Sequence, residues 1–129
     1  MKLGYTILYV DDVEASLTFF EKAFGLPRRF YHEGGYGEVE TGATALAFAS
    51  HVLGASNLPE GYVSASALNL PLGMEIALVC DDVQRAFDKA IEAGAKPLKA
   101  PMAKPWGQIV AYVQCPDGLL VELCTPVQP

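Results

Sequence analysis

The sequence has few of the residues that build disulfide frameworks and zinc clusters. It contains three cysteines, Cys80, Cys115 and Cys124, and two histidines, His32 and His51. Structural zinc sites take ligand pairs about two to four residues apart, and no two of these cysteines are that close. An odd number of widely spaced cysteines within apolar runs is typical of reduced, buried thiols, so we expect a cytoplasmic protein.

Positive charge and long apolar runs are also scarce. The 9 lysines and arginines stand against 15 aspartates and glutamates, which gives a formal net charge of -6 at pH 7. This charge repels nucleic-acid phosphates and anionic lipid surfaces, so we expect neither nucleic acid nor a membrane as partner. No apolar run approaches the roughly 20 residues that span a bilayer. The first residues enter a strand pattern and show no apolar signal-peptide region.

What the sequence does have is apolar periodicity. Of its 129 residues, 51% are hydrophobic and 19% are charged, which suits the core of a single domain. Residues 3–10 are largely apolar, β-branched or aromatic, and this predicts a strand buried on both faces. A helix is predicted from Val13, with Asp12 as its N-cap and Gly25 ending it. Further strands, with turns marked by Gly34-Gly35 and Gly42, are predicted at 28–33, 36–41 and 44–50.

The second half of the chain repeats the first. Residues 75–83 align without a gap on residues 5–13, an offset of 70 (75 minus 5). A helix from Val83 to Gly94 is expected next. After it come a short connection rich in proline and lysine (96–105) and strands at 109–114 and 119–125.

The segment between the repeats has a different character. Residues 51–73 are rich in Ser, Gly, Pro, Asn and Ala, with Glu60 the only formally charged side chain if His51 is neutral. A connection of this length is either a linker or a mobile flap over a cavity. We therefore divide one domain, residues 1–129, into a first module at 1–50, a connecting segment at 51–73 and a second module at 74–129.

An acidic pair stands directly before each helix, Asp11-Asp12 in the first half and Asp81-Asp82 in the second. A repeated pair of carboxylates raises the question of a metal site. However, this is the position at which a helix takes its N-cap. We interpret both pairs as helix caps.

Strand alternation places two glutamates opposite the aliphatic side chains of the second half. Leu119, Val121 and Leu123 are expected to pack beneath the helices, so Glu122 faces the other, concave side. A carboxylate within an apolar strand is costly unless it is solvated, paired or used, and Glu75 shares this character. Either both are ordinary solvent-facing side chains, or they line one pocket, where desolvation and repulsion raise the apparent pKa of the pair. Such a pocket suits a cation or holds a protonated carboxylic acid.

Aromatic side chains complete the predicted ligand-binding set. The repeat makes Tyr5 the counterpart of Glu75, so if Glu75 faces a cavity, Tyr5 should face it too. Trp106, the only tryptophan, lies between Pro105 and Gly107 at the start of a strand. Such a residue stacks on a ligand or packs an edge, and both interpretations stay open. The ligand-binding candidates are Tyr5, Tyr36, Phe48 (which also fits a core position), Glu75, Trp106 and Glu122.

The two repeats, the Asp-Asp-Val start of each helix and the ending Pro116-Asp117-Gly118-Leu-Leu-Val-Glu122-Leu123 resemble the glyoxalase/bleomycin-resistance/extradiol-dioxygenase superfamily, also called vicinal oxygen chelate proteins. The resemblance extends over essentially the whole chain. It implies an α+β fold of two βαβββ modules whose curled mixed sheets form a ligand cleft. It also implies a homodimer, since members of this size commonly pair and often build each cleft from modules of both chains.

Metal-using members of the superfamily hold a divalent ion through two histidines and two glutamates at equivalent points of the modules. Here only Glu122 matches that pattern. Tyr5 stands at the first-strand position, Glu75 replaces a histidine, and the late first-module position falls on Ala47 or Phe48. First-row metals favour imidazole ligands, so no cofactor is expected. The alternative is a divalent metal held by the carboxylates of Glu75 and Glu122.

The resemblance and these residues together predict a small-molecule binding protein of the bleomycin-resistance type. It would sequester an aromatic or cationic organic compound in an acidic and aromatic cleft, without chemistry. The alternative is an enzyme of the same superfamily, a glyoxalase-like lyase, an isomerase or a dioxygenase. Glu75 and Glu122 would then be its catalytic residues, as general acid and base or through a metal.

Overall fold

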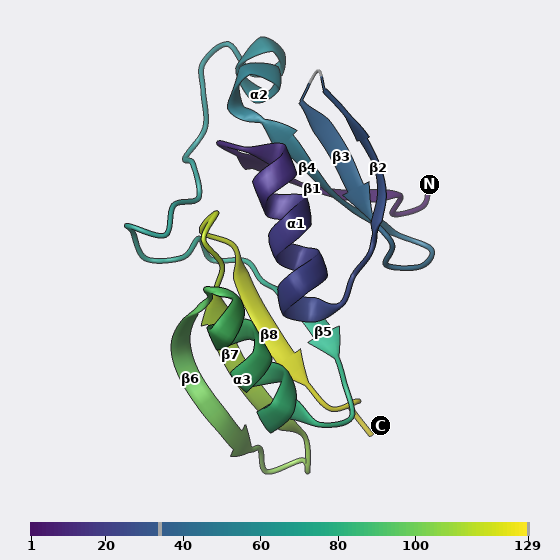
Figure 1. The fold of residues 1–129 in the computed structure, drawn as a ribbon, viewed down its shortest axis with the longest axis vertical. Helices are drawn as coiled ribbons and strands as arrows, with labels where there is room; N and C mark the ends of the chain where they lie inside the picture. The colour runs from purple at the N-terminus through teal and green to yellow at the C-terminus, as the bar shows by residue number, and fades with distance from the viewer. Residues whose placement is uncertain (34, 129) are drawn as a thin grey trace. The chain divides into compact units, whose positions relative to one another are not determined.

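The computed structural model of the chain describes residues 1–33 and 35–128, and it has an α+β fold (Figure 1). Gly34, predicted to lie in a turn, is outside these residues, as is Pro129. The chain divides into two compact units, Met1–Ala65 and Ser66–Pro129. Each unit has a mixed four-stranded sheet with a helix on one face.

The first unit contains the helix α1 and a sheet in the order β1-β4-β3-β2. The first and last strands, β1 and β4, pair in parallel, and the other pairs are antiparallel. Leu17 and Phe20 of α1 are fully buried against the sheet, and the ring of Phe20 lies 4.9 Å from that of Phe48. The elements are β1 (Tyr5–Val10), α1 (Val13–Phe24), β2 (Arg28–His32), β3 (Tyr36–Val39), β4 (Ala45–Ser50) and α2 (His51–Asn57).

The second unit has the same topology, with a sheet in the order β5-β8-β7-β6 and a parallel pair of β5 and β8. Val121 and Leu123 face α3 and are 0% and 2% exposed. The prediction of two βαβββ modules is therefore confirmed. The elements are β5 (Ile76–Val79), α3 (Val83–Ala93), β6 (Lys96–Ala103), β7 (Ile109–Gln114) and β8 (Leu120–Cys124).

The second aspartate of each acidic pair caps its helix, as predicted. The side chain of Asp12 accepts a hydrogen bond from the backbone N–H of Ala15 at 3.0 Å. Asp82 accepts one from the backbone N–H of Arg85 at the same distance. These bonds satisfy donors that the first turn of a helix leaves unpaired. Gly25 ends α1 in the left-handed region, with φ 69, which a residue with a Cβ rarely adopts.

Three sequence-based expectations need correction. The first strand is not buried on both faces, because α1 covers only one face of the sheet; Tyr5 is 63% and Ile7 46% exposed. The proline-rich segment after α3 is a strand, β6, and not a connection. Its prolines are tolerated because β6 is an edge strand whose pairing with β7 is irregular.

The third correction concerns the segment between the repeats, whose first residues form α2. Its N-cap is Ser50, whose side chain accepts a hydrogen bond from the backbone N–H of Leu53 at 3.1 Å. Residues 51–57 include glycine, serine and asparagine and show no clear apolar period, so the sequence did not predict a helix. None of the described helices is long and apolar enough to cross a membrane.

Candidate functional site

The helix-free face of the second sheet carries a cluster of two glutamates and a tyrosine. The strand register places Glu122 of β8 between Ala77 of β5 and Tyr112 of β7. The hydroxyl of Tyr112 donates a hydrogen bond to Glu122 Oε1 at 2.7 Å. Glu75, two residues before Ala77, has the parity of this face and lies near enough to Glu122 for that carboxylate to raise its pKa. We call Glu75, Tyr112 and Glu122 the carboxylate cluster.

The cluster alters the protonation of its members. Partial desolvation, together with the charge of Glu122 and the hydrogen bond to it, raises the pKa of Glu75. The hydrogen bond that Tyr112 donates to Glu122, with desolvation, raises the pKa of Tyr112 to about 12. The pKa of Glu75 is thus shifted in the direction that a neighbouring carboxylate and desolvation produce. A chemical consequence is that the cluster attracts a cation or retains a proton.

Two more side chains extend this face toward Trp106. Cys124 lies two residues beyond Glu122, and desolvation and Glu122 raise the pKa of its thiol to about 11. Gln108, just before β7, contacts Cys124 and accepts a hydrogen bond from Trp106 Nε1 at 2.9 Å. Trp106 is 57% exposed in the turn between β6 and β7. The second unit therefore carries both the carboxylate cluster and, at the turn before β7, an exposed indole.

The first unit has a related pair on its own helix-free face. The hydroxyl of Tyr36 donates to Glu38 Oε2 at 2.7 Å, and Arg29 Nη1 lies 3.5 Å from Glu38 Oε1. Desolvation and Glu38 raise the pKa of Tyr36 to about 12. Glu38 is only 4% exposed. The sequence analysis missed it, although alternation along β3 places Glu38 on the same face as its candidate Tyr36.

The register decides which residue of the first unit corresponds to Glu122. Ile7 pairs with Ala47 in the first sheet, and Ala77, its equivalent at an offset of 70, pairs with Glu122 in the second. The position therefore holds Ala47, which offers no side-chain ligand. Phe48 points the other way into the core, is 0% exposed and does not reach the helix-free face, which corrects its place among the ligand-binding candidates.

The structure thus distributes the remaining candidates over two faces. Tyr5 and Tyr36 lie on the first unit, and Glu75, Trp106 and Glu122 lie on the second. Within the second unit, the structure brings Glu75 and Glu122 together. It adds Tyr112 and Gln108, which the sequence analysis did not single out. Strand alternation was the available signal, because Gln108, Val110 and Tyr112 share the parity that faces Glu122.

The residues of the carboxylate cluster do not fit the catalytic metal of metal-using superfamily members. Among residues 1–33 and 35–128, no group of three or more histidine, cysteine, aspartate and glutamate side chains is arranged to hold a metal ion. Glu122 accepts the hydroxyl hydrogen of Tyr112, and the cluster contains no imidazole. A first-row metal would therefore find two carboxylates and no nitrogen ligand.

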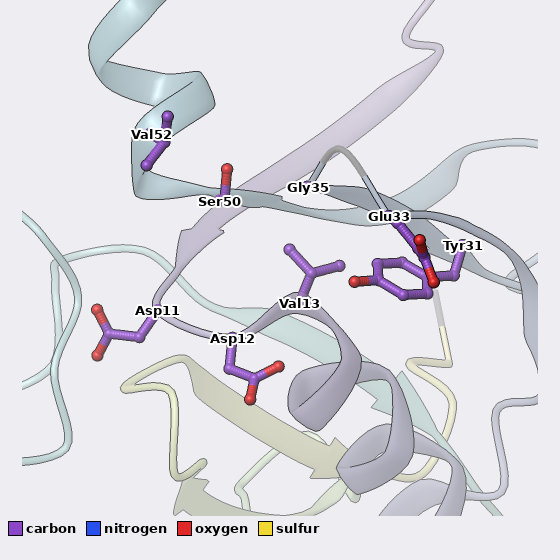
Figure 2. Close-up of a pocket in the computed structure, with 8 residues that line it drawn as sticks. All are labelled: Asp11, Asp12, Val13, Tyr31, Glu33, Gly35, Ser50 and Val52. Carbon is purple, nitrogen blue, oxygen red and sulfur yellow. The ribbon is translucent and has the colours of Figure 1, made fainter.

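An acidic pocket lies elsewhere in the first unit, where β1 leads into α1 (Figure 2). It has a volume of about 430 Å³. Several of its polar groups are already engaged, since Asp12 caps α1, Ser50 caps α2 and Asp11 pairs with His51. For this reason we do not place the ligand there. Its lining residues are Asp11, Asp12, Val13, Tyr31, Glu33, Gly35, Ser50 and Val52.

A chain of polar contacts attaches the segment after β4 to β1. His51 Nδ1 lies 2.6 Å from the hydroxyl of Tyr62, and His51 Nε2 lies 3.3 Å from Asp11 Oδ1. The ring of Tyr62 also packs on that of Tyr9, with 4.8 Å between the centroids. Desolvation, Tyr9 and Asp11 raise the pKa of the Tyr62 hydroxyl. Residues 51–62 are thus held to their own unit.

Comparison with known proteins agrees with this architecture. The family model of the Glyoxalase/Bleomycin resistance protein/Dioxygenase superfamily matches residues 2–123. No curated protein matches the sequence.

Solved structures with the same fold share little sequence with the chain. A glyoxalase-related enzyme from Fulvimarina pelagi has a TM-score of 0.85 at 22% identity, over 98% of this chain and 88% of that one. A glyoxalase/bleomycin resistance protein/dioxygenase family enzyme from Burkholderia phytofirmans PsJN has a TM-score of 0.73 at 21% identity, over 97% and 98%. TioX from Micromonospora sp. ML1 has a TM-score of 0.70 at 17% identity, over 97% and 98%. At these identities the likeness concerns the fold alone.

Proposed function

Because the chain belongs to the glyoxalase/bleomycin resistance protein/dioxygenase superfamily, we propose that it binds a small organic molecule, aromatic or cationic, on the helix-free face of its second sheet. The observation that carries this proposal is the hydrogen bond from Tyr112 to Glu122 on that face, with Glu75 near enough for Glu122 to raise its pKa. Two carboxylates this close repel one another when both are ionised. A ligand cation that touches both removes that repulsion and gains two charge-assisted hydrogen bonds or ion pairs.

The remaining groups on this face suit a flat ligand. Tyr112 donates to one oxygen of Glu122 and leaves the other lone pairs of the carboxylate available. The exposed ring of Trp106 offers a stacking surface and attracts a cation through its π face. Sequestration needs no metal, and the carboxylate cluster contains no imidazole to hold a first-row metal. We also propose a cytoplasmic location, because the three cysteines are free thiols. We propose a homodimer because superfamily members of this size commonly pair.

Isothermal titration calorimetry with planar aromatic cations, beginning with proflavine, tests the binding proposal. We expect saturable binding with one molecule per chain, weakened at least about tenfold in Glu122→Gln, which corresponds to roughly 1.4 kcal/mol. Glu92→Gln is the matched control, because Glu92 is an exposed glutamate on α3 of the same unit. Equal affinities of all three proteins, with unchanged circular dichroism, would contradict the proposal.

An acid–base enzyme is the second candidate, and the raised pKa of Glu75 beside Glu122 favours it. A protonated carboxyl group next to an ionised one supplies both a general acid and a general base. This activity is tested by incubating 2-oxo acids with the protein and a chelator in deuterated water. NMR then measures exchange of the hydrogens on the carbon next to the carbonyl group. Turnover that is lost in Glu75→Gln and Glu122→Gln would favour the enzyme. Metal-dependent turnover of the methylglyoxal–glutathione adduct would overturn both candidates.

A further inference from the structure

The indole of Trp106 is exposed, but its N–H group is not free. Trp106 Nε1 donates a 2.9 Å hydrogen bond to Gln108 Oε1. Between them lies Gly107, with φ 87, a conformation that favours glycine and that turns the chain from β6 into β7. An exposed tryptophan in such a turn ordinarily samples several rotamers. Here one edge of the ring is anchored.

The anchor is itself rigid. Gln108 is 8% exposed, and its Nε2 donates a 3.0 Å hydrogen bond to the carbonyl oxygen of Thr125. Because a carbonyl oxygen only accepts, the amide nitrogen must face Thr125 and the amide oxygen must face the indole. Thr125 is held in turn, since its hydroxyl accepts from the backbone N–H of Ile109 at 2.9 Å. The glutamine therefore joins the Trp106 ring to the end of the sheet.

The same glutamine lies next to the carboxylate cluster. Gln108 directly precedes β7 and has the parity of Tyr112, and both Gln108 and Glu122 affect the pKa of the Cys124 thiol. The hydrogen bond from Trp106 therefore ends on a side chain near Cys124, two residues after Glu122. The orientation of the ring is set from the same surface that carries the charged groups.

We propose that Gln108 is a positioning residue that holds the Trp106 indole as a preformed stacking surface for the ligand. This proposal rests on the function proposed above. Anchoring the ring before the ligand arrives lowers the entropy that binding would otherwise lose in ordering that side chain. The competing explanation is that Gln108 only satisfies buried polar groups. In that case its loss would lower stability without changing how a ligand meets the ring.

The sequence makes the test simple, because Trp106 is the only tryptophan and its fluorescence reports this ring alone. In Gln108→Met we expect greater indole mobility in time-resolved anisotropy, more quenching by acrylamide, and about five- to tenfold weaker binding of proflavine. Gln108→Glu keeps an oxygen acceptor for the indole but loses the N–H that donates to Thr125, so its anisotropy should fall between those of the original protein and Gln108→Met. Gln108→Lys keeps a donor toward Thr125 but has no acceptor for the indole, so we expect the same increase in indole mobility. This variant tests the proposal if Gln108→Met does not fold.

Gln114→Met is the matched structural control. Gln114 ends β7, the strand that begins directly after Gln108, and is 2% exposed, but its amide donates to backbone carbonyls of Ser66, Asn69 and Gly118. It should lose stability with no change in indole anisotropy. Unchanged anisotropy in Gln108→Lys, or an equal change in Gln114→Met, would overturn the positioning role. If the original protein binds no aromatic cation while Gln108→Lys frees the indole, the proposed function fails and the anchoring of the ring stands.

Discussion

Tyr112 and Glu122 face each other across β7 and β8, and the tyrosine hydroxyl donates its hydrogen bond to the glutamate from the neighbouring strand. In the first unit Tyr36 makes the same type of bond to Glu38, but from two residues away on one strand. The two halves therefore keep a tyrosine–glutamate pair on the helix-free face while using different positions. In the first half Arg29 lies between Glu38 and a second carboxylate, Glu40, whereas in the second half Glu75 affects the pair through its charge.

The two tyrosine–glutamate pairs predict a loss of stability in alkali. The pKa values of Tyr36 and Tyr112 are raised to about 12 in the folded protein, against 10.0 for an ordinary tyrosine. Between these values the unfolded chain loses protons that the folded protein keeps, so stability is full below about pH 10 and falls as pH rises toward about 12. Urea unfolding at increasing pH should show this fall, and Tyr36→Phe and Tyr112→Phe should each make it shallower. Tyr5→Phe, on the exposed part of β1, is the control.

Glu75→Gln is expected to stabilise the protein at neutral pH. A raised carboxyl pKa means that the folded state holds the proton more tightly than the unfolded chain. The contribution of Glu75 is thus present below its ordinary pKa and is lost as pH rises through the folded value. Removing the charge relieves repulsion of Glu122, worth about 0.5 kcal/mol at neutral pH, and the gain should vanish in acid. If the free energies of unfolding of the two proteins differed by the same amount at all pH values, the raised pKa of Glu75 would be contradicted.

Divalent metals should not stabilise the protein. Glu75 and Glu122 supply two carboxylates without an imidazole, and Glu122 already accepts a hydrogen bond from Tyr112. We expect no saturable change in Tm on addition of Ni²⁺, Zn²⁺, Mn²⁺ or Mg²⁺ to protein freed of metal by a chelator. Stabilisation by one of these ions that is abolished in Glu122→Gln would show that the carboxylates do form a metal site.

The core of the first unit depends on side chains of α1. Phe20 and Leu17 are 0% exposed, and Phe20 packs on Phe48. Phe20→Ala should lower the free energy of unfolding by about 3–5 kcal/mol and Leu17→Ala by about 2–5 kcal/mol, because each leaves a cavity. Val52→Ala, at an 82% exposed position, should change it by less than about 0.5 kcal/mol. Small effects at Phe20 and Leu17 in urea unfolding would refute the helix orientation.

Tyr62→Phe should loosen the segment after β4 without unfolding the unit. The substitution removes the hydroxyl that contacts His51 and keeps the ring that packs on Tyr9. Backbone amides of residues 51–62 should exchange faster with deuterium, whereas those of α1 should keep their rates. Unchanged exchange in residues 51–62 would show that ring packing alone holds the segment.

Features set by neighbours in the chain were predictable from the sequence. The N-caps of α1 and α3 join Asp12 to Ala15 and Asp82 to Arg85, three residues apart in each case. Strand parity, which is also local, separated Glu122 from its aliphatic neighbours Val121 and Leu123. The gapless repeat then indicated that the second half folds like the first.

Features that depend on packing were not predictable in this way. The strand β6 contains Pro97 and Pro101, and it exists because one edge of β7 was open to pairing. The helix α2 has little helical signal of its own; Ser50 caps it and Tyr62 packs against Gly54 within it. In both cases contacts with other elements outweigh weak local preferences.

By itself the sequence determined the two modules, their capped helices and the face on which Glu122 lies, because these follow from spacing along one chain. The tertiary structure decided which strands are neighbours and in what register. That choice put Tyr112 against Glu122, left Ala47 at the corresponding position of the first unit and sent Phe48 into the core. The physical reason is that cross-strand partners are selected by burial of the opposite face of the sheet, a condition that involves all four strands and the helix together.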